Sequence, residues 1–283
     1  QAEAIIDIIE AKTEDSLSLA VAQLDGTVSS FVKDVREQLI AMIAHLEVTI
    51  DYPEEDIEDV TSQEVREQLQ PILKAMDELL STANTGRLIR DGITTVIVGR
   101  PNAGKSSLMN ALLRENRAIV TDIPGTTRDS IEEYMTVEGI SLCLIDTAGI
   151  RDTQDTVEAL GVERARDYIN KADIVLCVID GSTPLNSEEI EILTSVSGLN
   201  TIVLLNKSDV AQVVTDENIK EHGTFTAIER ISAKEGEGSA VLSKWVQELV
   251  YGGRVKQDNS AMISNVRHIS LMEQAKAQVE QAL

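Results

Sequence analysis

The stretch Gly99-Arg-Pro-Asn-Ala-Gly-Lys-Ser106 decides the fold that we expect for this chain. It follows the apolar run Ile93–Val98, which is typical of a buried strand, and a helical pattern begins directly after it at Ser107. Gly99 and Gly104 permit backbone angles that are closed to residues with a Cβ, so successive N–H groups can turn inward around a phosphate chain. The following helix adds its unpaired N–H groups and the positive end of its dipole. The order of strand, glycine-rich loop and helix therefore predicts a phosphate-binding loop.

Individual side chains of this loop have expected roles. Lys105 is expected at the β- and γ-phosphates of a nucleotide, and the Ser106 hydroxyl at one coordination position of Mg²⁺. The alternative is a glycine-rich turn that arises by chance, and the strand, the spacing, the lysine and the serine together speak against it. The expected nucleotide-binding residues of the loop are Asn102, Ala103, Gly104, Lys105, Ser106 and Ser107.

Beyond the loop, short apolar runs alternate with helical stretches. Such alternation predicts a parallel sheet covered by helices on both faces. We expect this α/β domain to span residues 89–250. The further apolar runs are Ile140–Ile145, Ile174–Ile179 and Thr201–Leu205, and the helical stretches are Ser107–Leu113, Leu160–Asn170 and Ser187–Ser195.

Both flanks of this domain show a helical period instead. Apolar residues step by three or four over Leu17–Leu46, which predicts one long amphipathic helix. Further helices are expected over Val65–Ala83 and Met262–Val279. We therefore expect an all-α domain, formed by residues 1–88 and 251–283, into which the α/β domain is inserted.

The composition narrows the classes of function. A formal charge of −23 speaks against a large basic surface for nucleic acid, so any contact with RNA is expected to be local or supplied by a partner. Cys143 and Cys177 lie in apolar runs and predict buried thiols in a reducing compartment, without a metal or disulfide role. No apolar stretch approaches the ~18 residues that a membrane span needs. The cytoplasm is the expected location, with no membrane as partner.

Three later stretches indicate which nucleotide is bound. In Asp146-Thr-Ala-Gly149, Asp146 is expected to reach Mg²⁺ through a water and the Gly149 N–H to approach the γ-phosphate, although an Asp-to-Gly turn after a strand is common. In Asn206-Lys-Ser-Asp209, a carboxylate can accept from both the ring N–H and the exocyclic amine of guanine. The stretch Ser232-Ala-Lys234 follows the apolar run Ile228–Ile231 and can add backbone donors to the base. The expected binding residues here are Asp146, Gly149, Asn206, Lys207, Asp209, Ser232, Ala233 and Lys234.

Order and spacing make these motifs specific when they are taken together. Lys105, Asp146, Asn206 and Ser232 each come at the carboxyl end of a predicted strand, where an open α/β sheet binds its ligand. At this point the sequence resembles the translation-factor-related GTPases. The resemblance implies GTP rather than ATP, and it implies a Ras-like G domain with a mixed, mostly parallel sheet, inserted in the all-α domain.

The residues expected around the γ-phosphate depart from a Ras-like site. Thr121–Asp129 is expected to be the first switch, with Thr126 or Thr127 closing on Mg²⁺ and the γ-phosphate. Ile150 stands where a water-orienting Gln would be expected, and a side chain without polar atoms cannot position water. Hydrolysis therefore needs another group. Arg128 is either an arginine finger or an exposed structural residue.

A closer resemblance covers nearly the whole chain. The sequence is similar to the MnmE (TrmE) family of tRNA-modification GTPases in its phosphate loop, in Gly125-Thr-Thr-Arg-Asp129, in Asp146-Thr-Ala-Gly-Ile-Arg151, in Val157-Glu-Ala-Leu-Gly-Val-Glu-Arg-Ala165 and in the acidic Tyr52-Pro-Glu-Glu-Asp56. This resemblance implies a K⁺-stimulated GTPase whose two G domains meet as a homodimer across their nucleotide faces. It implies GTP or GDP, Mg²⁺ and K⁺ as ligands.

The roles of the family carry over to the residues that match its motifs. Asn102 matches a ligand of K⁺, and that ion places positive charge near the β- and γ-phosphates. Glu158 matches the water-orienting acid and joins Lys105 and Gly149 as the expected catalytic residues. The alternative for Glu158 is a surface helix carboxylate paired with a nearby Arg. Mg²⁺ is expected on Ser106, Thr127 and Asp146.

The resemblance also bears on partners. The family acts at the wobble uridine of tRNA together with a flavin-dependent partner protein. The sequence lacks the family's N-terminal folate-binding domain and its C-terminal Cys-containing motif. We therefore expect that this chain hydrolyses GTP but does not modify tRNA alone, and that tRNA is reached through the full-length complex.

Two alternative functions stay open on the sequence alone. One is a ribosome-assembly GTPase of the Era or Der type, which shares the phosphate loop and the Asn-Lys-x-Asp motif but would bring a basic RNA-binding module or a second G domain. The other is a module that binds GTP without hydrolysing it and only braces a helical scaffold. Single-turnover phosphate release would separate the scaffold from the enzymes.

Overall fold

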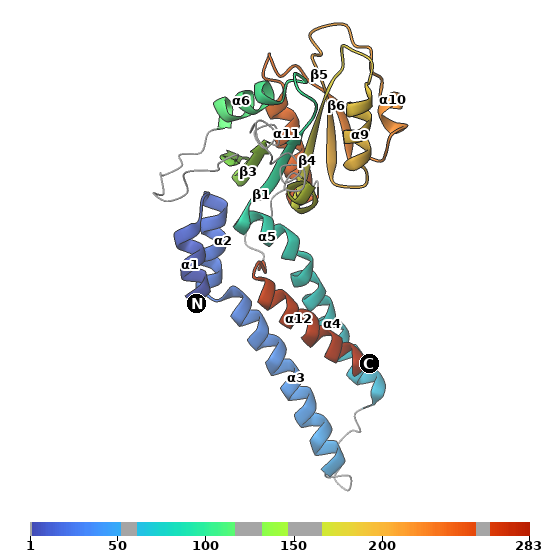
Figure 1. Ribbon diagram of the computed structural model, residues 1–283. Coiled ribbons are helices and arrows are strands. Elements are labelled where there is room, and N and C mark those ends of the chain that lie inside the picture. Colours follow the sequence, from blue (N-terminus) through green and yellow to red (C-terminus); the bar gives the residue numbers. More distant parts are fainter. Residues whose placement is uncertain (1, 52–60, 117–131, 147–165, 253–260) are drawn as a thin grey trace. The chain divides into compact units, whose positions relative to one another are not determined.

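A computed structural model describes residues 2–51, 61–116, 132–146, 166–252 and 261–283 of the chain. The chain divides into two compact units, which are best taken one at a time. The helical unit comprises Gln1–Asp91 and Val255–Leu283, and the α/β unit comprises Gly92–Arg254. Figure 1 traces both units along the chain.

In the described residues, the α/β unit is built on a six-stranded sheet with the strand order β2-β3-β1-β4-β5-β6. All neighbouring strands pair in parallel except β2, which runs antiparallel to β3. This mixed, mostly parallel sheet confirms the expected Ras-like α/β class. The strands are β1 Ile93–Val98, β2 Glu132–Val137, β3 Ile140–Asp146, β4 Ile174–Asp180, β5 Thr201–Asn206 and β6 Ala227–Arg230.

Strand β2 is the part of the sheet that the apolar runs did not reveal. It is joined to β3 by Glu138 and Gly139, whose φ angles are +52° and +80°. Two residues with positive φ form the kind of tight hairpin turn whose twist suits two antiparallel strands. The sequence of β2 begins with two glutamates, and its Met135 and Val137 are buried.

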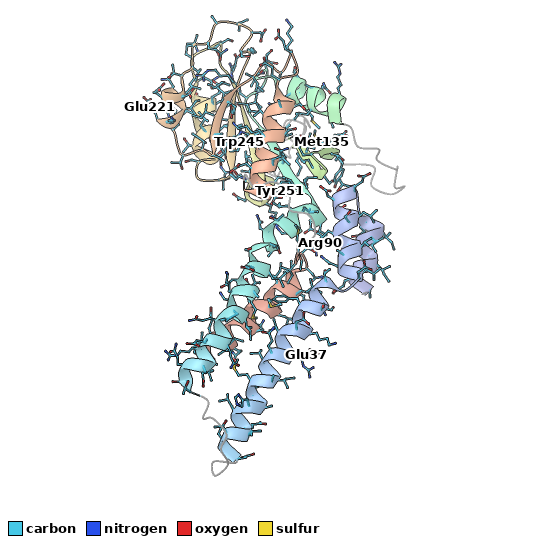
Figure 2. All side chains as sticks on the ribbon, turned by 180° about the vertical axis from the view of Figure 1, so that it is seen from behind. Glu37, Arg90, Met135, Glu221, Trp245 and Tyr251 are labelled. Carbon is cyan, nitrogen blue, oxygen red and sulfur yellow. The ribbon has the colours of Figure 1, made fainter. Side chains whose placement is uncertain are left out.

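Helices cover both faces of the sheet. Strands β4 and β5 are buried along their whole length, as expected for central strands of a parallel sheet. On one face, Leu193 of α9 and Ile219 of α10 join the alternate β4 residues in one apolar cluster. On the other face, α6 and α11 contact each other and β2, and the Trp245 indole N–H of α11 donates to Glu229 of β6 at 3.3 Å (Figure 2). These helices are α6 Lys105–Asn116, α9 Ser187–Ser195, α10 Asp216–Lys220 and α11 Gly238–Tyr251.

In the helical unit, the prediction of one long helix over Leu17–Leu46 is wrong. The chain breaks into α2 and α3 at Asp25 and Gly26, and Gly26 has φ +87°. The Asp25 N–H still donates to Val21 at 2.9 Å, but a left-handed residue ends the α-helical hydrogen bonding there. The unit consists of α1 Ala2–Glu10, α2 Glu14–Leu24, α3 Thr27–Asp51, α4 Ser62–Ser81, α5 Ala83–Asp91 and α12 Val266–Gln281.

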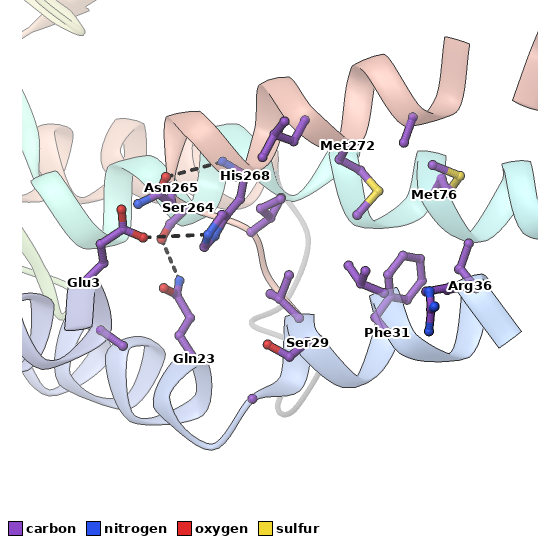
Figure 3. Close-up of a pocket in the computed structure, with 18 of the residues that line it drawn as sticks. Glu3, Gln23, Ser29, Phe31, Arg36, Met76, Ser264, Asn265, His268 and Met272 are labelled. Carbon is purple, nitrogen blue, oxygen red and sulfur yellow. Dashed lines mark hydrogen bonds and ion pairs between the residues drawn. The ribbon is translucent and has the colours of Figure 1, made fainter. Parts of the chain in front are cut away.

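The core of the helical unit lies where α4 meets α12 and α3, and it includes the buried Met76, Met272 and Met42. Beside it, an apolar groove of about 700 Å³ runs between α3 and α12 (Figure 3). At one end of the groove, the Gln23 side chain donates to the Ser264 hydroxyl at 2.6 Å. None of the helices in the described parts of the chain combines the length and apolar character that crossing a bilayer requires.

The two cysteines differ in burial. Cys177 in β4 is fully buried, which confirms its prediction, and burial raises the pKa of its thiol to about 12. Cys143 in β3 is only partly buried, so the prediction of a buried thiol is wrong there.

Candidate nucleotide-binding site

The candidate site lies at the carboxyl edge of the sheet. Because β1, β3, β4, β5 and β6 are parallel, their last residues all come to this edge. The predicted motifs follow directly from these strand ends, with the phosphate loop after Val98 and the Asn-Lys-x-Asp motif beginning at Asn206. Open α/β sheets bind ligands at this edge, in the crevice where the loops diverge.

The phosphate loop has the backbone shape that its glycines predict. Gly99 has φ +151°, and a Cβ built there would meet the carbonyl oxygen of Val178. Gly104 has φ +105°, and a Cβ there would meet the side-chain amide of Asn206. Asn102 has φ +63°, a left-handed conformation that Asn tolerates better than most residues. A backbone in which residues with positive φ are interspersed with ordinary residues forms a concave row of N–H groups, which suits a phosphate.

Lys105 bends back over the loop from the first turn of α6. Its side-chain Nζ donates to the carbonyl oxygens of Gly99 at 2.8 Å and Arg100 at 2.9 Å, and the residue is only 7 % exposed. Ser106 and Ser107 follow in the same turn and are exposed. The first N–H groups of an α-helix have no partner within the helix. The loop therefore presents donors and one positive charge together, which fits the phosphates of a nucleotide.

Asn206 joins the phosphate loop to the turn Ser232-Ala-Lys234. Its side-chain Nδ2 donates to the carbonyl of Ala103 at 2.8 Å, and its Oδ1 accepts from the N–H of Ala233 at 3.0 Å. Asn206 is 3 % exposed, so both hydrogen bonds are shielded from water. One buried amide thus holds together two loops that are more than a hundred residues apart in the sequence.

The other residues predicted to bind the base lie around Asp209. The Asp209 carboxylate is exposed and accepts from the Ser232 hydroxyl at 3.1 Å. The Ser232 N–H donates to Glu237 at 2.8 Å, which fixes the turn that carries Ala233 and the exposed Lys234. A carboxylate that is exposed and yet held at one oxygen can accept hydrogen bonds from a ligand.

A cluster of charges beneath these loops was missed by the sequence analysis. The side chain of Lys207, which has φ +66°, forms an ion pair with Asp180 at 2.6 Å. The Arg100 guanidinium forms ion pairs with Glu189 at 2.7 Å and with Asp180 at 3.4 Å. Burial would raise the pKa of Asp180, but the hydrogen bonds from Lys207 and Ser182 outweigh it and hold that pKa below its usual value. Asp180 ends an apolar strand just as Asn206 does, and that position was the available signal.

Several predicted site residues lie outside the described residues. They are Thr126, Thr127, Arg128, Gly149 and Glu158. For Asp146, the backbone ends strand β3 and pairs with Ile97 of β1, while its side chain lies outside the described part. The structure thus brings together the phosphate loop, Asn206, Lys207, Asp209 and the turn at Ser232.

Comparison with known proteins gives a family match along the whole chain. The family model described as MnmE helical domain matches residues 1–283. Proteins named tRNA modification GTPase MnmE are 45% identical in Geobacillus thermodenitrificans and 43% identical in Bacillus subtilis, each over 100% of this chain and 62% of the relative. A relative of the same name from Heliobacterium modesticaldum is 47% identical over the same shares.

Solved structures give weaker overall matches. A crystal structure of Aquifex aeolicus Era bound to GDP and AlF₄⁻ matches with a TM-score of 0.42 and 27% identity, covering 62% of each chain. The chain spans 62% of the length of the curated relatives that it matches. Because the family model matches from the first residue to the last, this chain belongs to the family of the MnmE helical domain.

Proposed function

We propose that the α/β unit binds GTP and hydrolyses it to GDP and phosphate. The observation that carries this proposal is the bridge made by Asn206 between Ala103 of the phosphate loop and Ala233 of the base-side turn. A nucleotide requires a phosphate site and a base site at a fixed separation, and this buried amide holds the two loops together. The names of the relatives, which call them tRNA modification GTPases, support the proposal.

The base is proposed to be guanine, recognised by Asp209. An ionised carboxylate only accepts hydrogen bonds, and guanine offers both its ring N–H and its exocyclic amine on one edge. Adenine offers no such pair, so binding it would leave polar groups at the site without partners. The Ser232 hydroxyl donates to one Asp209 oxygen and orients the carboxylate.

For the phosphates, we propose that Ser106, Asp146 and Thr127 hold Mg²⁺ and that Asn102 is a ligand of K⁺. Asn102 is exposed at the turn of the phosphate loop, and Ser106 is exposed one residue after Lys105. When bound, these cations supply positive charge against the negative charge of the triphosphate. Lys105 contributes a fixed positive charge from the protein itself, and Glu158 is proposed to orient the attacking water.

We also propose a place for this activity in the cell. The relatives are named tRNA modification GTPases, and we propose that this chain serves tRNA modification as well. The proposed position is the wobble uridine, and the proposed location is the cytoplasm. The proposed assembly is a homodimer through the α/β units, formed on GTP and K⁺ binding, which acts with a flavin-dependent partner protein. The charge of −23 fits a chain that leaves most RNA contacts to other parts of such a complex.

The proposal for the base is tested by Asp209→Asn. An amide in this position offers a donor where the carboxylate accepted, so it should favour xanthine, which carries a carbonyl in place of the exocyclic amine. Calorimetric titration should show that the unaltered protein prefers GDP to ADP and XDP, and that the variant prefers XDP. Asp216→Asn, at a partly exposed carboxylate paired with Arg230, is the matched control and should keep the GDP preference. A preference of the unaltered protein for adenine nucleotides would refute the assignment.

The proposal for hydrolysis is tested by phosphate release under multiple turnover. Turnover in KCl should exceed turnover in NaCl at matched ionic strength, and equal rates would contradict the K⁺ site. Glu158→Ala should lower turnover and leave GTP affinity nearly unchanged, because a group that orients water acts mainly in the transition state. A large loss of affinity instead would contradict the role of Glu158.

A further inference from the structure

Asp180 and Asn206 are paired neighbours at the ends of two central strands. They stand opposite each other in the parallel register of β4 and β5. Both are buried, with 4 % and 3 % exposure respectively. Asn206 connects the two nucleotide loops, which are the phosphate loop and the turn at Ser232, through its amide. Asp180 carries a charge at the neighbouring strand end.

Asp180 contacts the phosphate loop and the segment that follows Asn206. One of its oxygens, Oδ2, lies 2.6 Å from Lys207 Nζ on the base side and 3.4 Å from an Arg100 nitrogen of the phosphate loop. The other, Oδ1, accepts from the Ser182 N–H at 3.1 Å and from the Ser182 hydroxyl at 2.6 Å. A single carboxylate oxygen is therefore shared by a cation of the phosphate loop, Arg100, and a cation of the Asn206–Asp209 segment, Lys207.

The cluster is balanced in charge and held firmly. Arg100 also pairs with Glu189, whose side chain has no exposure, at 2.7 Å. Glu189 in turn accepts from the Asn186 N–H at 3.1 Å in the cap of α9. Two buried acids thus meet two cations. Removing one partner of such a cluster leaves a buried charge uncompensated, so the positions of the partners are strongly coupled.

The backbone on the base side needs such support. Lys207 has φ +66°, which is unfavourable for a residue with a long side chain. Its carbonyl accepts from the Gln212 side chain at 2.7 Å, and its ammonium is held by Asp180. These two contacts orient the segment that leads to Asp209.

We propose that Asp180 is a positioning residue that couples phosphate binding to base recognition, acting through Arg100 on one side and Lys207 on the other. This inference rests on the proposed function. It adds that a substitution in the phosphate-loop part of the cluster changes how well the base is recognised. Asp180 is only 4 % exposed, so its effect is carried by Arg100 and Lys207.

The test uses the whole chain and two substitutions that keep side-chain size. Asp180→Asn removes the shared charge, and Arg100→Lys keeps the charge but loses the planar fork that reaches both acids. Dissociation constants of GDP and of IDP, which lacks the exocyclic amine, are measured by calorimetry, and melting temperatures by circular dichroism. The ratio of the two constants reports how well the base side is positioned. Asp216→Asn, in an exposed ion pair of the same 2.6 Å length, is the control.

In Asp180→Asn we expect GDP affinity to fall by about tenfold, as coupled neighbours typically show, and the preference for GDP over IDP to fall several-fold. Arg100→Lys should lower the same preference although Arg100 belongs to the phosphate loop. The control Asp216→Asn should change neither the GDP affinity nor the preference for GDP over IDP. Where Asp180→Asn does not fold, Arg100→Lys decides alone.

Two results would overturn the inference in distinguishable ways. Variants that melt earlier but keep the GDP-to-IDP ratio would show that the cluster is merely structural, while the proposed function stands. An unaltered protein that binds no guanine nucleotide would refute the proposed function and this inference together.

Discussion

Replacing Asn206 with Ala removes the bridge between the two nucleotide loops and has a calculable cost. The carbonyl of Ala103 and the N–H of Ala233 lose their partner, and both of these residues are buried. Two buried groups without partners cost about 3 kcal/mol together. For a unit of the size of Gly92–Arg254, this corresponds to a fall in melting temperature of roughly 6–12 °C. GDP affinity should fall by at least about tenfold, because the separation of the two loops is no longer fixed.

A matched control lies at the other end of the same strand. Asn200 precedes β5, donates to the carbonyl of Asp173 at 2.7 Å and accepts from the Thr226 hydroxyl at 2.9 Å. Asn200→Ala also removes two hydrogen bonds, but at the edge of the sheet away from the loops. It should lower the melting temperature and leave GDP affinity unchanged. The reasoning would be refuted if Asn206→Ala melted like the unaltered protein, or if both variants lost GDP affinity equally.

Three further predictions concern the thiols, the pH dependence and a helix cap. Cys177 should not react with a thiol reagent at pH 8 until the protein unfolds, because burial raises its pKa to about 12; rapid labelling of Cys177 in the native protein, located by mass spectrometry, would contradict this. The pKa of Asp180 is lowered in the folded state, so its charge stabilises that state above the ordinary value of 3.8, and the contribution is lost as the pH falls through the lowered pKa. Asp180→Asn should therefore lose less stability than the unaltered protein on acidification below about pH 5 in urea titrations, and an equal loss would argue against the ion pair. Thr13→Ala removes the side chain that accepts from the Ser16 N–H at the start of α2 and should cost about 1 kcal/mol in the same titrations. The exposed Ser18→Ala in the same helix is its control and should cost little.

The sequence was informative wherever a feature depends on residues close together in the chain. The phosphate loop begins directly after its strand, and the φ angles of +151° and +105° at Gly99 and Gly104 are ones that favour glycine. The break between α2 and α3 was missed because the apolar period continues across it, and the signal against a continuous helix was a single glycine after Asp25. Strand β2 was missed because it begins with two glutamates and holds no long apolar run, so its pairing with β3 is what defines it.

The charge cluster was missed for a different reason, which is distance along the chain. Arg100 meets Glu189 across 89 residues and Asp180 across 80. A local pattern cannot reveal such a pair, because each residue alone resembles an ordinary surface charge. The position of Asp180 at the end of an apolar strand was visible, but its partners depended on the strand order of the sheet.

The register of β4 against β5 connects the fold to the site. Both strands are apolar and buried along their length, so no alternation of polar and apolar faces selects one register. Side-chain contacts at both ends supply that selection. The Asn200 side chain donates to the carbonyl of Asp173 at 2.7 Å where the strands begin. Where they end, Asp180 pairs with Lys207 at 2.6 Å and the Asn206 side chain donates to Ala103 at 2.8 Å. A slip by one residue would turn Asp180 or Asn206 away from its loops and leave a buried polar group without partners. The residues that hold the two nucleotide loops therefore also specify how the centre of the sheet is paired, so a folded α/β unit already has its phosphate and base loops in place.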